Sequence, residues 1–184
     1  TGVELGELKK SNIDLGSAIT DENIGTSVSE LSEPLANLIE KHRIWVETAG
    51  SNGKQLDLSG IDMRTLKSLK GEKLTAIKGI GTKFFGMNLY KIQLQSATLD
   101  GSDFRNCDLE EADLRGTSFV GANFSHSKMP NANCSALMFG GGGGTKRFSP
   151  CNFTDAKLRY ADMKNAEMKN AVFHNCDFSY AVFC

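Results

Sequence analysis

The stretch CDLEEADLRGTSFVGANF, residues 107–124, places a large apolar residue at every fifth position. These residues are Leu109, Leu114, Phe119 and Phe124. An amphipathic helix repeats its apolar residues about every 3.6 positions, and a strand with one buried face repeats them about every 2. A repeat of five fits neither element, and it indicates a backbone that turns a corner once in each unit.

The five-residue repeat extends along most of the chain. It runs upstream to Leu69 and, after a slip of one residue, begins at Leu58. Downstream it runs to Phe139, breaks in the glycine run at 140–144, and resumes in a new phase at Phe148. These positions hold ten of the chain's 11 phenylalanines and no charged residue. We therefore expect a continuous core whose centres include Leu109, Leu114, Phe119, Phe124, Phe153 and Phe173.

A second repeat of small residues lies two positions before each centre, and the residue between them is often Asp or Asn. The units ADLRG (112–116), ANFSH (122–126) and ADMKN (161–165) show the full pattern. Burying one large side chain gains about 1.5–3 kcal/mol, whereas ordering a residue costs about 1–2 kcal/mol. A unit of five residues cannot meet that cost alone, so the units must stack on one another as in a solenoid.

The unit resembles that of the pentapeptide-repeat family, whose pattern is A-(D/N)-L-x-x, and the resemblance covers about residues 56–184. It implies an all-β solenoid, namely a right-handed, four-sided (quadrilateral) parallel β-helix with four units in each coil. The units nearest the N-terminus fit worst, because Lys67 and Glu72 occupy places of small residues and Gly79 occupies a centre.

The segment before the repeats divides into two parts. Residues 1–31 are polar and weakly periodic, which predicts an N-terminal arm or linker. Residues 32–53 predict an α-helix with Ser32 as N-cap and Pro34 in its first turn. The first coil of a solenoid exposes core and unpaired backbone, so we expect this helix to cap the β-helix of residues 54–184. A helix that binds a partner is the alternative.

Charge and cysteine placement exclude several classes of protein. The net charge is −1, so no overall field attracts nucleic acid. No apolar run approaches the roughly 20 residues of a membrane span. Cys107, Cys151 and Cys176 occupy small-residue places and Cys134 a centre, as expected for core residues without a metal. Reduced thiols in a core suit the cytoplasm. We expect no membrane association, no direct binding of nucleic acid and no cofactor.

No motif for catalysis emerges. The acidic residues Asp108, Glu110, Glu111 and Asp113 occupy outward places, where carboxylates are solvated. The run Gly140–Gly144 lacks the spacing of a phosphate-binding loop. We expect a protein that is not an enzyme, with a glycine-rich loop at 140–147 between coils. The candidate residues of this loop for contact with a partner are Gly140, Gly144, Thr145, Lys146 and Arg147.

The favoured function is a non-catalytic scaffold that binds another, unidentified protein. The alternative is a DNA mimic that binds DNA gyrase or topoisomerase, as the quinolone-resistance members of the family do. Banded charge disfavours it, because residues 67–91 carry a net +5, residues 97–124 a net −4 and residues 146–184 a net +2. A secreted bacterial effector is the third interpretation.

The repeats continue to Phe183, so the last coil is expected to expose strand edges and core side chains. Unprotected edges favour pairing with another chain, and the resemblance implies the same, since members of the family can dimerise through their last coils. We therefore expect a homodimer whose interface includes Phe173, Phe178 and Phe183. The alternative is that residues after Cys184, missing from this chain, fold over the last coil.

Overall fold

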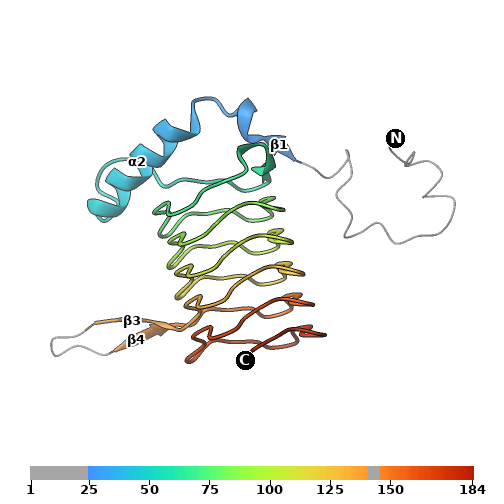
Figure 1. The fold of residues 1–184 in the computed structure, drawn as a ribbon. Coiled ribbons are helices and arrows are strands. Elements are labelled where there is room, and N and C mark those ends of the chain that lie inside the picture. Colours follow the sequence, from blue (N-terminus) through green and yellow to red (C-terminus); the bar gives the residue numbers. More distant parts are fainter. Residues whose placement is uncertain (1–24, 141–145) are drawn as a thin grey trace, which may run out of the picture.

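The computed structural model describes residues 25–140 and 146–184. The repeats wind into a stack of coils that forms a rod (Figure 1). Helix α2 (Leu35–Glu47) lies across the N-terminal end of the rod, and a hairpin projects from its side near the other end (Figure 1). Most of the predicted arm, residues 1–24, lies outside the described residues.

Regular strands make up little of the described chain. Strand β1 (Thr26–Ser27) pairs in parallel with β2 (Ile61–Asp62), and β3 (Leu137–Phe139) pairs antiparallel with β4 (Arg147–Ser149). The coils of the rod are joined by isolated parallel bridges of single residues. Through most of the rod the two residues of a bridge are 20 positions apart, as Asp103 and Asn123 are.

These bridges fall into four columns, and a step of five residues along the chain moves from one column to the next. One column contains Asp62, Lys83, Asp103, Asn123, Lys157 and Asp177. Four five-residue units therefore complete one coil. Residues five apart lie on neighbouring sides of the rod, and residues 20 apart lie above one another on the same side.

The corner between units is formed by a residue with left-handed backbone. It lies two positions after each centre, as at Asn106 with φ 57° and Gly121 with φ 67°. Glycine adopts this conformation without steric cost and Asn tolerates it, whereas most residues are disfavoured there. This requirement explains why Gly and Asn are frequent at the last place of the repeat.

The centres form the dry interior of the rod. Leu109, Leu114, Phe119, Phe124 and Phe153 have no exposed surface, and Phe173 is partly buried against the core. Aromatic centres one coil apart stack face to face, with ring centroids 4.8 Å apart for Phe104 and Phe124. Offset stacking of this kind adds about 0.5–1.5 kcal/mol to the gain from burial.

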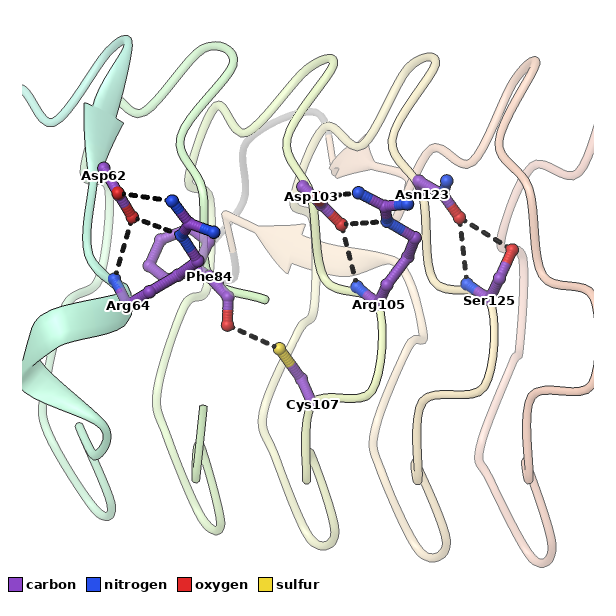
Figure 2. A network of polar contacts seen from close by, with 8 residues as sticks. All are labelled: Asp62, Arg64, Phe84, Asp103, Arg105, Cys107, Asn123 and Ser125. Atoms are coloured by element: carbon purple, nitrogen blue, oxygen red, sulfur yellow. Dashed lines mark hydrogen bonds and ion pairs between the residues drawn. The ribbon is translucent and has the colours of Figure 1, made fainter. Parts of the chain in front are cut away.

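Residues in the small place satisfy backbone groups of the preceding coil. The Ser102 hydroxyl donates to the carbonyl of Gly79 at 2.7 Å, and the Cys107 thiol donates to the carbonyl of Phe84 at 3.0 Å (Figure 2). The absent side chain at Gly79 leaves no hole, because a Cβ there would lie 2.8 Å from Cδ2 of Leu99. Leu99 thus fills the space of the missing centre.

The slip in the repeat has a local cause. Upstream of it the bridge partners are 21 residues apart, as Asp57 and Lys78 are, and downstream Ser68 and Asn88 are 20 apart. The 3-10 helix η2 (Arg64–Leu66) lies between these two bridges and takes up the additional residue.

The repeat predicted around the glycine run places two residues in the core that the structure does not bury. Phe139 and Phe148 are 47% and 55% exposed, so they are not centres of the core. Strands β3 and β4 pair with each other and not with a neighbouring coil. Consequently Ser118 bridges to Asn152, which lies 34 residues later and not 20. The last buried centre before the hairpin is Cys134, and the next is Phe153.

The segment before α2 differs from the predicted arm over residues 26–30. Strand β1 pairs with β2, and the following 3-10 helix η1 (Val28–Glu30) buries Val28. These contacts tie the segment to the first coil.

Helix α2 is shorter than the predicted 32–53, and Ser32 is not its N-cap. The N-cap is Pro34, which has extended backbone and makes no side-chain capping bond. At the other end the N–H of Gly50 donates to the carbonyl of Trp45 at 2.8 Å, and Gly50 has φ 85°. A left-handed glycine of this kind is a frequent helix terminator.

His42 joins α2 to the first coils. It is completely buried. Its Nδ1 accepts from the N–H of Leu56 at 3.1 Å, so Nε2 carries the proton and donates to the carbonyl of Thr75 at 2.8 Å. A second proton on Nδ1 would break the bond to Leu56. Burial lowers the pKa of His42, and the bond to Thr75 opposes this in part.

We predict that the free energy of unfolding decreases as the pH falls below about 6.5. The unfolded chain binds a proton at His42 near its ordinary pKa of about 6.5, whereas the folded protein binds it only at lower pH. The unfolded state therefore holds more protons in this window, and stability falls with the pH. Urea denaturation between about pH 7.5 and 5.5 measures the slope.

The variant His42→Gln should lose most of this slope, although it lowers stability at every pH. His174→Gln, which alters an exposed histidine, should keep the slope of the natural sequence. Equal slopes for all three proteins would contradict the role of His42.

Candidate interaction surfaces

One side of the rod carries a regular series of turns closed by side chains (Figure 2). Oδ1 of Asp103 accepts from the backbone N–H of Arg105 at 3.1 Å, and Oδ1 of Asn123 accepts from that of Ser125 at 3.0 Å. Asp and Asn favour such Asx turns because the side chain satisfies the backbone two residues later. This bond accounts for the Asp or Asn that precedes many of the centres.

Where an Arg follows an Asp by two residues, its guanidinium group also forms an ion pair with the Asp carboxylate that closes the turn. Nε and Nη2 of Arg105 donate to the two carboxylate oxygens of Asp103 at 2.9 and 2.7 Å (Figure 2). Arg64 binds Asp62 in the same way, with 2.8 Å for each bond. The hydrogen bond from Arg64 lowers the pKa of Asp62, so this carboxylate remains ionised and has a structural role.

The acidic residues of 108–113 do not come together as a catalytic pair. Asp108 bridges to Lys128 in one column, and Asp113 bridges to Asn133 in another. Glu111 accepts from the Tyr90 hydroxyl at 2.9 Å and pairs with Lys91 at 3.1 Å. Both bonds lower the pKa of Glu111, and the bond from Tyr90 has the larger effect. Over residues 25–140 and 146–184, no three His, Cys, Asp or Glu residues are placed to hold a metal ion.

The basic segment 67–91 does not form one basic face. Lys73, Lys78 and Lys83 bridge to residues of three different columns, so their side chains surround the rod. Lys70 and Lys91 lie near each other, with ammonium groups 4.9 and 5.1 Å from the centre of the Tyr90 ring. The positive charge that is concentrated in this segment of the sequence is therefore spread over several sides of the rod.

The cysteines lie in or near the core. Cys107, Cys134 and Cys151 are buried, Cys176 is partly buried and Cys184 is exposed. Burial raises the pKa of the Cys107 thiol to about 12. A thiol of this kind is protonated at neutral pH and is a poor nucleophile.

The β3–β4 hairpin exposes three large apolar side chains. Met138 is 55% exposed, and Phe139 and Phe148 project beside it. Of the predicted loop residues, Gly140 follows β3 with φ 86°, Lys146 is exposed, and Arg147 pairs with Phe139 in the hairpin. Gly144 and Thr145 lie outside the described residues.

The base of the hairpin packs on the corner at Gly116. The N–H of Gly116 donates to the carbonyl of Ser135 at 3.2 Å, and the Ser149 hydroxyl donates to the carbonyl of Gly116 at 3.3 Å. A Cβ at Gly116 would lie only 2.8 Å from Cβ of Leu137. The hairpin is thus held in a defined position by close backbone contact.

The last described coil presents partly covered aromatic residues. The Phe173, Phe178 and Phe183 rings contact one another in sequence, with centroids 5.3 and 5.5 Å apart. Phe183 is 41% exposed. The last coil and the hairpin both lie at the end of the rod opposite α2 (Figure 1).

Comparison with known families identifies the repeat. The family model for pentapeptide repeats matches residues 88–125 and 151–184 in 8 copies. The match confirms the resemblance found in the sequence, and these repeats belong to the pentapeptide-repeat family. The two matched segments flank the hairpin, which interrupts the repeat. No curated protein matches the chain significantly.

Several solved structures are similar to the chain. One is the pentapeptide-repeat protein Rfr23 from the cyanobacterium Cyanothece 51142, with 20% identity over 61% of this chain and 65% of that one and a TM-score of 0.35. Another is HetL from Nostoc sp. strain PCC 7120, which is involved in heterocyst differentiation regulation, with 16% identity over 71% of this chain and 54% of that one and a TM-score of 0.33. The chain spans less than two thirds of either protein.

A further similar structure is that of QnrB1, a plasmid-mediated fluoroquinolone resistance protein, in a trypsin-treated form. It shows 20% identity over 69% of this chain and 72% of that one, with a TM-score of 0.30. Separately, none of the helices in the described part of the chain is long and apolar enough to cross a membrane.

We predict that Gly116→Ala destabilises the protein more than Gly121→Ala does. Both glycines have φ 67°, so each alanine meets the same left-handed penalty of about 1–2 kcal/mol. Nothing lies within 4 Å of a Cβ at Gly121, whereas a Cβ at Gly116 meets the hairpin. Thermal unfolding of the two variants measures the difference. Equal melting temperatures would show that the hairpin can move away from the added Cβ without loss of stability.

Proposed function

We propose that this protein is a non-catalytic scaffold that binds another protein through the β3–β4 hairpin. The supporting observation is the exposure of Met138, Phe139 and Phe148 on one projecting element. Apolar patches of this kind are rare on monomeric proteins unless they meet a partner, and Met and Phe are enriched in the centres of protein interfaces.

The rod and helix α2 have supporting roles in this proposal. The rod is a right-handed, four-sided β-helix, in keeping with the four columns of bridges and the family resemblance. Helix α2 caps its N-terminal end, a role supported by Leu35, Leu38 and Ile39 packing against the core and by the two bonds of His42. Buried free thiols support a cytoplasmic location.

The DNA-mimic alternative requires an extended acidic face. The columns of bridges carry both signs, and the one through Asp62, Lys83 and Asp103 alternates between them. The Asp carboxylates of that column are also engaged by Arg64 and Arg105. This distribution favours the scaffold over the gyrase-binding function, and no observation on the described residues favours a secreted effector.

We expect the double variant Met138→Ser with Phe148→Ser to lose partner binding. The protein captured by the natural sequence from a lysate of the source organism would be purified and its affinity measured by calorimetry. Loss of two central apolar contacts should weaken binding at least tenfold, about 1.4 kcal/mol or more. The control Leu66→Ser with Ile80→Ser removes side chains 39% and 45% exposed on the rod and should bind normally.

Equal binding by both double variants would refute the role of the hairpin. The same preparations would be added to a DNA gyrase supercoiling assay with and without quinolone. Inhibition or protection at sub-micromolar protein, unaffected by the hairpin substitutions, would support the DNA-mimic function instead.

We further propose a homodimer that forms through the last described coil. The partial exposure of Phe183, together with that of Val182 at 43%, supports an apolar surface that a second copy would cover. Light scattering should give twice the monomer mass for the natural sequence and the monomer mass for Phe183→Asp. A monomeric natural protein would disprove the dimer.

A further inference from the structure

A cavity of about 310 Å³ opens on the side of the rod that carries the turns of Asp103 and Asn123. Its lining comes from three successive coils, because Asp103 bridges to Asn123 and Asn123 bridges to Lys157. The lining residues are Arg105, Asn123, Ser125, His126, Lys157, Arg159 and Tyr160. Three of them are cations and none is acidic, so the cavity suits an anionic group.

The cations of this cavity are only partly neutralised. Arg105 uses Nε and Nη2 for Asp103, which leaves its other terminal nitrogen outside that pair. Nε of Arg159 lies 3.4 Å from a carboxylate oxygen of Asp177. Lys157 has no ion pair within 4.0 Å among the described residues. Oδ1 of Asn123 accepts from Ser125, so the amide nitrogen of Asn123 is not used in that turn.

A column of aromatic rings borders the cavity. The rings of His126 and Tyr160 stack with centroids 4.7 Å apart, and those of Tyr160 and Tyr180 stack 4.8 Å apart. Tyr160 and Tyr180 are 46% and 71% exposed. The hydrophobic core does not account for these rings, because they stand outside it.

The backbone beneath these rings is disfavoured. His126, Tyr160 and Tyr180 occupy the corner place and have φ of 60°, 57° and 61°. Most units place Gly or Asn there, and a bulky residue in this conformation is uncommon. Three aromatic residues in one column thus sit on strained backbone, which is frequent at binding sites.

We propose that this cavity binds an acidic segment of a partner protein. A carboxylate of the segment is held by Lys157 and Arg159, and the adjoining residues lie along the edges of the aromatic column. The proposal rests on the scaffold function, since it supplies a second contact for the protein bound at the hairpin. Tyr and Arg are also the residues most enriched among the dominant contacts of protein interfaces.

Two features favour a protein over single-stranded nucleic acid. The bases of a nucleic acid stack on free aromatic faces, but the facing sides of these rings are occupied by each other. The cationic region is also short. In the column Asp103, Asn123, Lys157 and Asp177 it is bounded by a carboxylate at each end, whereas proteins that bind single strands use a positively charged groove that follows the backbone over several nucleotides.

Binding of rhodamine-labelled deca-glutamate, followed by fluorescence anisotropy, tests the proposal. The natural sequence should bind at an ionic strength of about 0.02 M and more weakly at about 0.15 M, because salt screens exposed charges. Lys157→Gln with Arg159→Gln should weaken binding at least tenfold. Lys73→Gln with Lys78→Gln removes the same charge from other sides of the rod and should bind within about twofold of the natural sequence.

The variant Tyr160→Asn tests the aromatic column separately. Asn suits the left-handed corner, which offsets the loss of the two stacking contacts, so the melting temperature should change little, yet binding of deca-glutamate should weaken about threefold or more. Unchanged affinity in this variant would remove the aromatic column from the site.

Absence of binding by the natural sequence, or equal weakening by the two pairs of Lys and Arg substitutions, would overturn the proposal. Tighter binding of labelled oligothymidylate than of deca-glutamate, abolished by Lys157→Gln with Arg159→Gln, would assign the cavity to nucleic acid instead. Neither result tests the role of the hairpin in binding, because Met138→Ser with Phe148→Ser leaves every residue of the cavity unchanged. Loss of partner capture through those two substitutions therefore reports on the scaffold function alone.

Discussion

The fold depends on backbone hydrogen bonds between residues one coil apart. The N–H of Phe104 donates to the carbonyl of Asn123 at 2.8 Å, and the N–H of Asn123 donates to the carbonyl of Ser102 at 2.9 Å. Such bonds recur at every side of the rod, and they keep their register where each unit has the same length as the unit above it, so any additional segment must loop out, as η2 and the hairpin do. This constraint imposes the strict repeat of five and directs one large side chain per unit into the interior.

The same constraint governs the outer surface. Because a coil contains four units, residues that are neighbours on one side are 20 positions apart in sequence. Runs of like charge along the chain are therefore dispersed, as the lysines of 67–91 are, and surface sites are assembled from successive coils. The proposed acidic-segment cavity is such a site, with Arg105, Ser125 and Arg159 contributed by successive turns.

The hairpin is the principal departure from regularity, and the proposed function is built on it. The backbone groups of its two strands form hydrogen bonds with each other, so the hairpin projects without disturbing the bridges between coils on either side of it. The rod supplies a rigid support, and the contact between Gly116 and Leu137 positions the hairpin on that support. A projecting apolar element on a rigid base loses little conformational freedom on binding, which favours affinity.

The sequence alone determined the interior of this protein. The five-residue repeat placed Leu109 and Phe124 inside because a buried centre demands a large apolar side chain, a requirement that is local to each unit. It could not locate the ends of α2, where Pro34 and not Ser32 precedes the helix, or show that Phe139 and Phe148 leave the core. Only the tertiary structure decided which surface residues meet. His126 and Tyr160 stack although 34 residues separate them, because the hairpin lengthens one coil by an amount that no local pattern records.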